Sequence, residues 1–474
     1  MDTIAAIATP HGLGGIGIIK ISGPEAIPVA SRIFRNGPPP VTSCNQSDDG
    51  ETQPFFFRPW RLHYGHIVDT RKDGHVYDEV LLAVMPSPRS YTREDVVEIQ
   101  AHAGPVILKR ILNLIIGHEG VRLSDPGEFT RRAFLNGRID LTEAEGVMDM
   151  ISAKSVAAAG IAMAHISGLF RDSIKKLISM LYDLRVPIEA GIDFPDDMDG
   201  ETDCHEVAIK LTEAVLNPLK QLVEHHHAGN FFRTGLSVVI AGGPNVGKSS
   251  LMNRLLHEER AIVSDIPGTT RDFIEASMVS KGIPIVLADT AGFRTEAGPI
   301  ETLGIENANK VITKADIVLF VVDASKPFDD DVMCLFDLLE EKGKRRIVVV
   351  NKWDIPETEH EFITPRLFKE PYLVHTSCIQ DTGIDELRNM IADIVFSASS
   401  VAHDRIVPNL RQKKALETAV IHLDSAIKAL DSGSTVELAA IDLFTAEDSL
   451  REVIGDVLRP DILDSIFNNF CVGK

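Results

Sequence analysis

Four near-continuous apolar runs in the middle of the chain constrain its fold most strongly. They are Ser237–Ile240, Pro284–Leu287, Ile317–Val322 and Ile347–Val350. Such runs are typical of strands in a parallel sheet that helices cover on both faces. Each run is followed by polar residues, and α/β folds bind ligands at these carboxyl ends of their strands. The sequence therefore predicts an α/β domain with a ligand site along one edge of its sheet.

A glycine-rich segment, Gly242–Ser249, follows the first apolar run and precedes a helical pattern. It matches the phosphate-loop pattern. Glycines let backbone N–H groups turn towards the phosphates, and the helix N-terminus adds partial positive charge. Lys248 is expected to reach the β- and γ-phosphates, and the Ser249 hydroxyl to bind Mg²⁺. The alternative, a chance glycine-rich turn, does not explain the strand before it and the helix after it.

Two further motifs end the second and fourth apolar runs. In Asp289–Gly292, we expect Asp289 to bind Mg²⁺ through water and the Gly292 N–H to sense the γ-phosphate. In Asn351–Asp354, the Asp354 carboxylate can accept two hydrogen bonds, from the N1–H and the 2-amino group of guanine. Adenine lacks this pair of donors and would leave the carboxylate unpaired. The sequence therefore predicts a preference for GTP over ATP.

Three other segments bear on the same site. Thr376–Cys378 stands where GTPases usually carry Ser-Ala and contact the base through the backbone, so a cysteine is tolerable there. Gly268–Asp272 contains Thr270, the candidate second Mg²⁺ ligand of switch I. Phe293 stands where Ras-like enzymes place a glutamine that orients water, and a phenyl ring cannot do this. Catalytic charge stabilisation must come from elsewhere, either from an arginine finger or from a metal cation.

Helical patterns flank this α/β domain. Apolar residues step by three or four along Ile166–Leu184 and again along Leu416–Leu430, which is the spacing of one helix face. We therefore expect a helical domain into which the α/β domain is inserted. Before it, Ile16–Ile19 and Val96–Ile99 are predicted strands. The run His225–His227 is expected to be a solvated helix end rather than a metal site.

The bulk composition is that of a soluble globular chain. The 474 residues are 44% hydrophobic and 25% charged, and the length predicts about three domains. No apolar run is long enough to span a bilayer, and the N-terminus lacks the apolar core of a signal peptide. Five scattered cysteines without zinc-ligand spacing favour a reducing cytoplasm. The net charge of -21 argues against a broad phosphate-binding surface, although a local basic patch can lie within an acidic total.

Segments outside the nucleotide motifs carry a family resemblance along essentially the whole chain. They are Asp2–Ala6, Gly14–Ile18, Gly127–Gly137, Ile192–Pro195 and Cys471–Lys474. With these segments the chain resembles the MnmE (TrmE) family of tRNA uridine-modification GTPases.

The resemblance implies a multidomain α/β plus α fold. A folate-binding α/β N-terminal domain (1–125) would hold a homodimer together. A discontinuous helical domain would comprise 126–232 and 398–474, and a Ras-like phosphate-loop G domain (233–397) would be inserted into it. The implied cofactors are GTP, Mg²⁺, K⁺ and a tetrahydrofolate derivative of the 5-formyl or methylene type. The implied partners are tRNA and an FAD-binding protein resembling MnmG (GidA), and no membrane is involved.

The resemblance also implies the chemistry. A one-carbon unit from tetrahydrofolate would become part of an aminomethyl-type (carboxymethylaminomethyl) group at C5 of the wobble uridine. GTP hydrolysis would drive conformational change. K⁺ at the interface between two G domains would take the place of an arginine finger, and Glu301 would help to position the attacking water. Cys471 would lie close to the folate, with either a part in the chemistry or only a structural role.

The site residues follow from the motifs and from the resemblance. The predicted GTP-binding residues are Asn245, Val246, Gly247, Lys248, Ser249, Ser250, Ser264, Asp265, Ile266, Pro267, Gly268, Thr269, Thr270, Asp289, Thr290, Ala291, Gly292, Asn351, Lys352, Asp354, Ser377 and Cys378. The predicted metal ligands are Ser249 and Thr270 for Mg²⁺, and Asn245, Ser264, Ile266 and Thr269 for K⁺. The predicted folate contacts are Lys20, Glu98, Arg138 and Lys474, with Lys20 in place of Arg and Arg138 in place of Lys, a change that keeps charge but not bidentate geometry. The predicted catalytic residues are Glu301 and Cys471.

Two other functions compete with this interpretation. An Era-type regulatory or ribosome-assembly GTPase predicts an RNA-binding module after the G domain, but the C-terminal helical block has no G-x-x-G loop. A folate-binding scaffold with a degenerate G domain conflicts with the intact Lys248, Ser249, Asp289 and Asp354.

Overall fold

The structure is a computed structural model, and it divides into two compact units. It describes residues 2–10, 12, 14–37, 56–69, 71, 74–193, 203–256, 275–289, 312–313, 315–326, 330–355, 370–396, 406–432, 436–457, 460–468 and 470–473. One unit is Met1–Met148 with Ile454–Lys474, and the other is Asp149–Val453. The boundaries of these two units do not coincide with the predicted domain boundaries at 125, 232 and 397. The three predicted domains stay a prediction.

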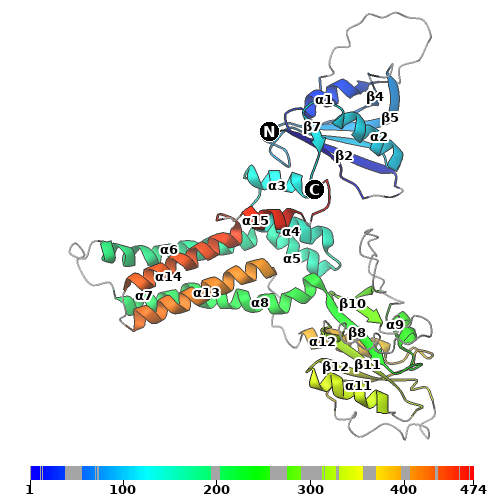
Figure 1. Cartoon of the computed structure of the whole chain (residues 1–474), viewed down its shortest axis with the longest axis vertical. Helices are drawn as coiled ribbons and strands as arrows, with labels where there is room; N and C mark the ends of the chain where they lie inside the picture. The colour runs from blue at the N-terminus through cyan, green and yellow to red at the C-terminus, as the bar shows by residue number, and fades with distance from the viewer. Residues whose placement is uncertain are drawn as a thin grey trace, which may run out of the picture. The chain divides into compact units, whose positions relative to one another are not determined.

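A seven-stranded sheet forms the centre of the first unit, in the order β3-β4-β5-β6-β2-β1-β7 (Figure 1). The strands are β1 (Thr3–Ile7), β2 (Ile16–Ser22), β3 (Phe34–Asn36), β4 (Leu62–Asp69), β5 (His75–Met85), β6 (Val96–His102) and β7 (Val121–Leu123). β7 pairs with β1 in parallel, and the other neighbouring strands pair antiparallel. The strands predicted at Ile16–Ile19 and Val96–Ile99 are confirmed.

Two helices, α1 (Ala26–Ile33) and α2 (Pro105–Ile116), pack on the apolar residues of this sheet. In α2, Pro105 occupies the first turn, where its missing N–H costs nothing. The buried side chains of α2 recur at Leu108, Ile111 and Ile115, which places them on one helix face. These contacts bury one face of the sheet and leave the alternate side chains of its strands for the other face.

Helices α3 (Glu128–Leu135), α4 (Leu141–Ser152) and α15 (Pro460–Phe467) extend the first unit. Gly127, just before α3, has φ 67°, and a Cβ there would lie 2.6 Å from the carbonyl oxygen of Phe467. The close approach of α3 to the C-terminal segment therefore requires glycine at this position. Ala144 of α4 joins Phe467 and Phe470 in a small buried cluster.

A partly buried ion network ties α3 to Asp2, the residue before β1. The Arg132 guanidinium contacts Glu128 at 2.9 Å, Glu94 at 3.1 Å and Asp2 at 2.8 Å. Arg122 adds a second cation, 2.5 Å from Glu128 and 2.6 Å from Asp2. Burial alone would raise the pKa of Glu128, but hydrogen bonds from Arg122 and Arg132 outweigh it and lower that pKa. A hydrogen bond from Arg122 is the main cause of the lowered pKa of Asp2.

The second unit has helices before and after its α/β part. They are α5 (Val156–Ile166), α6 (Leu169–Asp193), α7 (Cys204–Leu211), α8 (Asn217–Thr234), α13 (Leu410–Asp431) and α14 (Val436–Ile454), with a π-helical turn at Thr212–Leu216 between α7 and α8. α13 contacts both α7 and α8, so helices from the two sides of the α/β insertion pack together. The predicted helix over Ile166–Leu184 starts later, because Gly168 adopts φ 78° and separates α5 from α6.

Two histidines hold the segment that returns from the α/β part to the helices. His226 of α8 donates from Nδ1 to the carbonyl oxygen of Pro408 at 2.7 Å, and His165 of α5 donates from Nε2 to that of Val407 at 3.0 Å. His226 is only 6% exposed. The expectation of a solvated helix end at His225–His227 is therefore wrong for His226, because packing against the return segment buries this ring.

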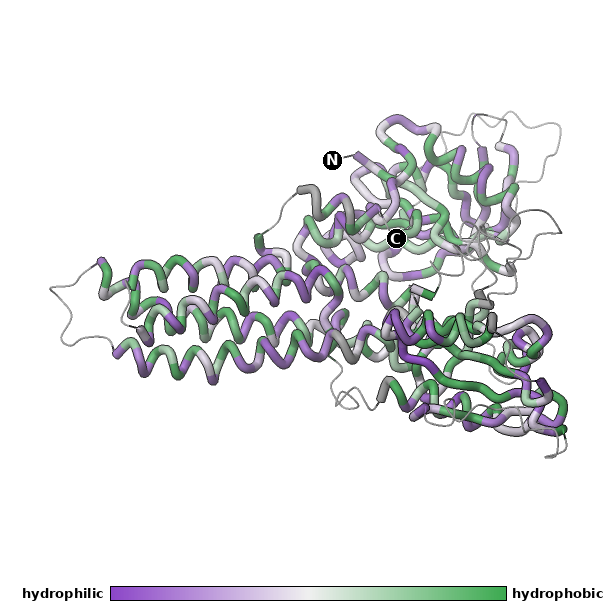
Figure 2. The backbone as a smooth tube through the Cα atoms, turned by 60° about the horizontal axis from the view of Figure 1, so that its bottom comes forward, coloured by the Kyte–Doolittle hydropathy of each residue, from purple (hydrophilic) through white to green (hydrophobic). Residues whose placement is uncertain are grey.

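The α/β part contains a six-stranded sheet in the order β13-β12-β11-β8-β10-β9. The strands are β8 (Leu236–Gly242), β9 (Glu275–Ser280), β10 (Ile283–Asp289), β11 (Ile317–Asp323), β12 (Arg345–Asn351) and β13 (Leu373–Thr376). All neighbouring pairs are parallel except β9 with β10. The four predicted core strands are confirmed, and they appear as green runs in Figure 2.

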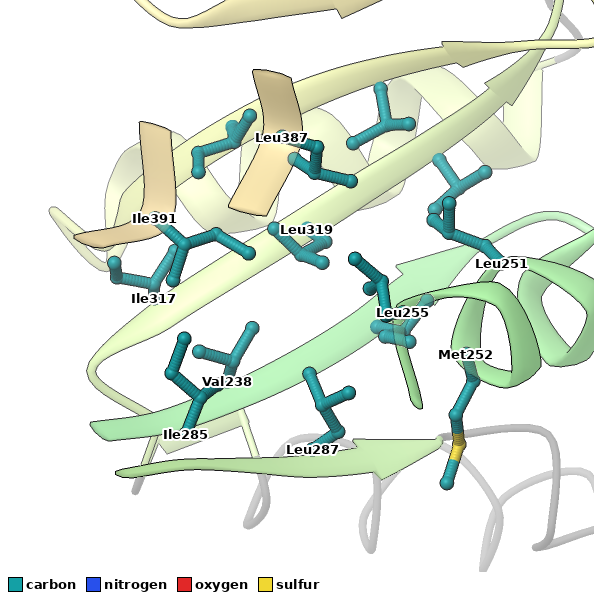
Figure 3. Packing of buried hydrophobic residues seen from close by; sticks show 14 of the residues in the cluster. Val238, Leu251, Met252, Leu255, Ile285, Leu287, Ile317, Leu319, Leu387 and Ile391 are labelled. Carbon is teal, nitrogen blue, oxygen red and sulfur yellow. The ribbon is translucent and has the colours of Figure 1, made fainter. Parts of the chain in front are cut away.

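Helices cover both faces of this sheet. On one face, Leu251 of α9 (Lys248–Leu256) and Leu387 of α12 (Ile384–Phe396) pack over Leu319 and its neighbours (Figure 3). On the other face, Phe336 of α11 (Asp330–Glu341) packs against Phe320, with ring centroids 5.6 Å apart. Apolar cover on both faces explains why these strands are continuous rather than alternating apolar runs.

The ion network around Arg132 generates the first prediction. Arg132→Met would leave Glu94 without its cation and take one of two cations from Glu128, and it should destabilise α3 and β1 by about 3–5 kcal/mol. Hydrogen exchange of the α3 and β1 amides measures this as a local opening free energy. Arg89→Met, at an exposed position, is the control and should leave exchange unchanged.

The destabilisation caused by Arg132→Met should become smaller in acid. A lowered folded pKa means that Glu128 contributes stability above its unfolded pKa, near the ordinary 4.5, and loses it as the pH falls through the folded value. A difference between Arg132→Met and wild type that stays constant from neutral pH to strong acid would contradict this account.

Candidate functional site

The predicted phosphate loop lies between β8 and α9 in the conformation that its glycines allow. Gly242 has φ 152° and Gly247 has φ 95°, and Asn245 between them adopts φ 60°. A Cβ on Gly242 would collide with the carbonyl oxygen of Val321 in the neighbouring strand β11. The chain can therefore turn so tightly here only with glycine at these positions.

Lys248 folds back over this loop. Its Nζ donates to the carbonyl oxygen of Gly242 at 3.1 Å and to that of Gly243 at 2.6 Å. Ser249 and Ser250 follow in the first turn of α9, and both are exposed. The first N–H groups of a helix lack intrahelical partners. Together with the Lys248 ammonium they make this helix end suitable for a phosphate chain.

Asn351, the last residue of β12, joins the phosphate loop to the neighbouring loop. It is 2% exposed, and its Nδ2 donates to the carbonyl oxygen of Val246 at 2.8 Å. Its Oδ1 accepts from Thr376 Oγ1 at 3.3 Å and from Cys378 Sγ at 3.5 Å. One buried side-chain amide thus binds two other segments, through the backbone of the phosphate loop and through the side chains of Thr376 and Cys378. Burial also raises the pKa of the Cys378 thiol.

Lys352 and Asp354 continue this motif in defined positions. Lys352 has φ 64°, and its Nζ lies 2.6 Å from Asp323 Oδ2 at the end of β11. Burial alone would raise the pKa of Asp323, but hydrogen bonds from Lys352 and Ser325 outweigh it and lower that pKa. Asp354 Oδ1 accepts from Ser377 Oγ at 2.6 Å, which orients the carboxylate. Asp323 was missed in the sequence, although it is the polar residue that ends the third apolar run.

Several predicted residues lie outside the described part of the chain. These are Ser264, Asp265, Ile266, Pro267, Gly268, Thr269, Thr270, Thr290, Ala291, Gly292, Phe293, Glu301 and Lys474. Asp289 is described only by its backbone, which ends β10 beside Ile240 of β8. Of the predicted metal ligands, the structure describes Ser249 and Asn245, both of which are exposed. Their side-chain oxygens suit hard cations such as Mg²⁺.

Three of the four predicted folate contacts, Lys20, Glu98 and Arg138, lie near one another in the first unit. Lys20 of β2 and Glu98 of β6 are cross-strand partners, with Nζ and Oε1 3.8 Å apart. The Lys20 ammonium lies 5.4 Å from the centre of the Tyr91 ring and 5.5 Å from that of Phe129. The Arg138 guanidinium lies 4.8 Å from the Tyr91 ring and donates to the Tyr91 carbonyl oxygen at 3.1 Å. We refer to these five residues as the cation cradle.

Tyr91 and Phe129 are the members of the cation cradle that sequence reasoning missed. Tyr91 donates to or accepts from Thr130 Oγ1 at 3.0 Å, and burial raises its pKa. Phe129 could have been found from the sequence, because it lies within Gly127–Gly137, one of the segments that carry the family resemblance. Cys471 is exposed, and its carbonyl oxygen accepts from the Gly127 N–H at 3.4 Å.

Comparisons with known proteins cover the whole chain. The family model for the MnmE helical domain matches residues 141–471, and the model for the GTP-binding protein TrmE N-terminus matches residues 3–138. A relative named tRNA modification GTPase MnmE from Thermoanaerobacter sp. (strain X514) is 41% identical over 474 residues, which are 100% of this chain and 99% of the relative. One of the same name from Bacillus pumilus (strain SAFR-032) is 40% identical over 476 residues and 100% of both chains.

Solved structures match a smaller part. The G domain of the T. maritima FeoB iron transporter is 27% identical with a TM-score of 0.25, over 33% of this chain and 97% of that one. An Era variant of Aquifex aeolicus bound to GDP.AlF4- is 25% identical with a TM-score of 0.27, over 39% of this chain and 66% of that one. Scores this low add nothing to the fold described above. No helix in the described ranges is long and apolar enough to cross a membrane.

Gly247 gives a test of the phosphate loop. Gly247→Ala puts a Cβ against the Asn351 amide, at a backbone φ that disfavours any side chain. We expect nucleotide affinity to fall about tenfold or more, because about 1.4 kcal/mol of strain already has that effect. The matched control is Gly243→Ala in the same loop, where the nearest atom, Cγ2 of Val332, is at 3.4 Å. Equal GDP dissociation constants for both variants would contradict the assignment.

Proposed function

This chain belongs to the MnmE (TrmE) family of tRNA modification GTPases, and we propose that it modifies C5 of the wobble uridine of certain tRNAs. It is a GTP hydrolase of that family. The relatives that show this extend over its full length. The observation that carries the nucleotide assignment is the bridge from Asn351 to the phosphate loop beside the oriented Asp354 carboxylate.

In the proposed hydrolysis, Lys248 and the N-terminus of α9 bind and orient the phosphate chain. Ser249 and Thr270 would hold Mg²⁺, which neutralises phosphate charge when bound. Asn245 with Ser264, Ile266 and Thr269 would hold K⁺, which supplies positive charge in place of an arginine finger. Glu301 would accept a hydrogen bond from the attacking water and so direct it. The exposed side chain of Asn245 at the loop is compatible with this role.

Recognition of guanine is assigned to the Asp354 side of the site. The carboxylate accepts the base N1–H and 2-amino donors, while Ser377 holds it in orientation. Lys352, fixed by Asp323, would lie along the base. The backbone at Ser377 and Cys378 would contact the remaining edge of the base. The half-buried Asp354 carboxylate would be left without its two donors beneath a bound adenine, which explains why ATP would be rejected.

The cation cradle is proposed to bind a tetrahydrofolate derivative of the 5-formyl or methylene type. Glu98 is a carboxylate suited to the N–H donors of a pterin ring. Lys20 and Arg138 are cations suited to the 4-oxo group of the pterin and to the carboxylates of the glutamate tail. The Tyr91 and Phe129 rings supply flat apolar surface. Lys474 would add a further cation, and Cys471 would lie near the one-carbon unit. The support is the convergence of both cations on the Tyr91 ring.

Partners are proposed from the family and from the uncovered sheet face. Ile16, Leu62, Tyr64 and Leu81 are exposed apolar residues of β2, β4 and β5, and such side chains favour association with another apolar surface. We propose that this part forms a homodimer. We also propose a complex with an FAD-binding MnmG (GidA)-like protein, tRNA as substrate and a cytoplasmic location.

The tRNA role is tested in cells. Wobble-uridine nucleosides in total tRNA are quantified by mass spectrometry with and without this chain. We expect the aminomethyl-type C5 modifications to vanish without the chain and to return with it, because no other step would install them. Cys471→Ser then tests the thiol. Unchanged nucleosides would refute the tRNA role and favour an Era-like regulatory GTPase.

The folate assignment is tested by binding. Lys20→Met removes a cation whose hydrogen bond to an anionic ligand contributes about 1.5–3 kcal/mol. We expect 5-formyltetrahydrofolate to bind about tenfold more weakly or worse, as measured by calorimetry. Lys109→Met, at an exposed position of α2, is the control. Equal affinity of the two variants would remove Lys20 from the site.

A further inference from the structure

Besides Asn351, Arg254 also connects the phosphate side of the nucleotide site to the loop assigned to the base. This residue belongs to α9, the helix that begins at the phosphate loop with Lys248. Its Nε donates to the carbonyl oxygen of Cys378 at 2.9 Å. The helix that would hold the phosphates therefore also holds the backbone of the loop assigned to the base.

That loop is short and otherwise closed on itself. Ser377 N donates to Thr382 O at 3.0 Å, and Thr382 N donates back to Ser377 O at 3.2 Å. Gly383 follows with φ 73°, where a Cβ would collide with the carbonyl oxygen of His375. The loop thus leaves β13 in a tight turn. The carbonyl oxygen of Cys378, in the middle of this loop, accepts the hydrogen bond from Arg254.

Arg254 is anchored well enough to hold another segment in place. Its neighbours Leu251 and Leu255 are buried against the sheet (Figure 3). Arg388 of α12 donates from Nη2 to the carbonyl oxygens of Arg254 at 2.9 Å and Leu255 at 3.1 Å. These carbonyls lie in the last turn of α9, where intrahelical partners are missing. The helix end is therefore fixed before Arg254 reaches the loop.

We propose that Arg254 is a positioning residue for base recognition. The peptide unit is planar, so a fixed carbonyl oxygen on Cys378 also fixes the N–H of the next residue and restrains the N–H of Cys378. In the proposed base site, these N–H groups would donate to O6 of guanine. The inference rests on the proposed contact between the Ser377–Cys378 backbone and the base. It adds that the phosphate-loop helix sets the position of that contact.

The weaker contact of Arg254 does not account for this arrangement. Its Nη1 lies 3.6 Å from Asp381 Oδ1, with the two side chains 37% and 52% exposed. Exposed ion pairs of this kind contribute little. The hydrogen bond to the Cys378 carbonyl reaches the main chain of the loop, so loss of the donor and not loss of charge should matter most.

The test compares two nucleotides in purified full-length protein. GDP and 6-thio-GDP differ only at position 6, where sulfur is a weaker acceptor than oxygen. Arg254→Met keeps the apolar stem and removes the donor. We expect the dissociation constant of GDP to rise about five- to tenfold. That of 6-thio-GDP should rise less, so that the ratio of the two constants shrinks by about twofold or more, as in a double-mutant cycle.

Control variants separate positioning from general damage. Arg345→Met removes an exposed arginine of the same sheet and should leave both constants unchanged. Arg254→Lys should recover part of the lost GDP affinity, and it carries the test if Arg254→Met does not fold. The proposal would be overturned if Arg254→Met left the ratio of the GDP and 6-thio-GDP dissociation constants unchanged. This would be seen if the affinity for both nucleotides fell equally, or if neither affinity fell.

A further variant, Asp354→Asn, tests the placement of the base site separately from the role of Arg254. An asparagine amide can donate to the 2-oxo group of xanthine, so this variant should prefer XDP to GDP. If it does not, the base site is wrongly placed. If it does and Arg254→Met leaves the GDP to 6-thio-GDP ratio unchanged, only the role of Arg254 fails.

Discussion

The buried amide of Asn351 is the contact on which the nucleotide site depends. It donates to Val246 in the phosphate loop and accepts from Thr376 and Cys378 in the loop after β13. A buried amide whose partners are lost is left with unsatisfied polar atoms, which costs about 1–3 kcal/mol. The two loops are therefore held in one relative arrangement. Asp354 and Lys352 gain their orientation from the same short segment.

The first unit depends in a similar way on a buried charge. Arg132 draws Glu128, Glu94 and Asp2 together, and this ties α3 to Asp2, the residue before β1. Phe129 follows directly in that helix, and its ring faces Lys20. A network whose desolvation cost offsets much of its Coulombic gain thus positions Phe129 of the cation cradle.

The helical part connects to the α/β part through buried polar contacts rather than apolar ones alone. His165 and His226 bind consecutive carbonyl groups of the return segment. Gly229 of α8 leaves room for Val407, because a Cβ there would collide with the valine side chain. The return segment is therefore seated by shape and by hydrogen bonds together, and α13 can begin at Leu410 with its capping box at Asn409.

The sequence by itself determined the core strands and the order of the nucleotide motifs, because apolar runs and glycine-rich turns are local properties. Through the family resemblance it also predicted Lys20, Glu98 and Arg138 as folate contacts, and these side chains lie near one another. Only the tertiary structure decided that the Tyr91 ring contacts two cations, that His226 is buried and that Arg254 reaches Cys378. Each of these joins positions far apart in the chain. Whether a polar side chain faces water or a buried partner depends on which segments pack beside it, and periodicity carries no information about that.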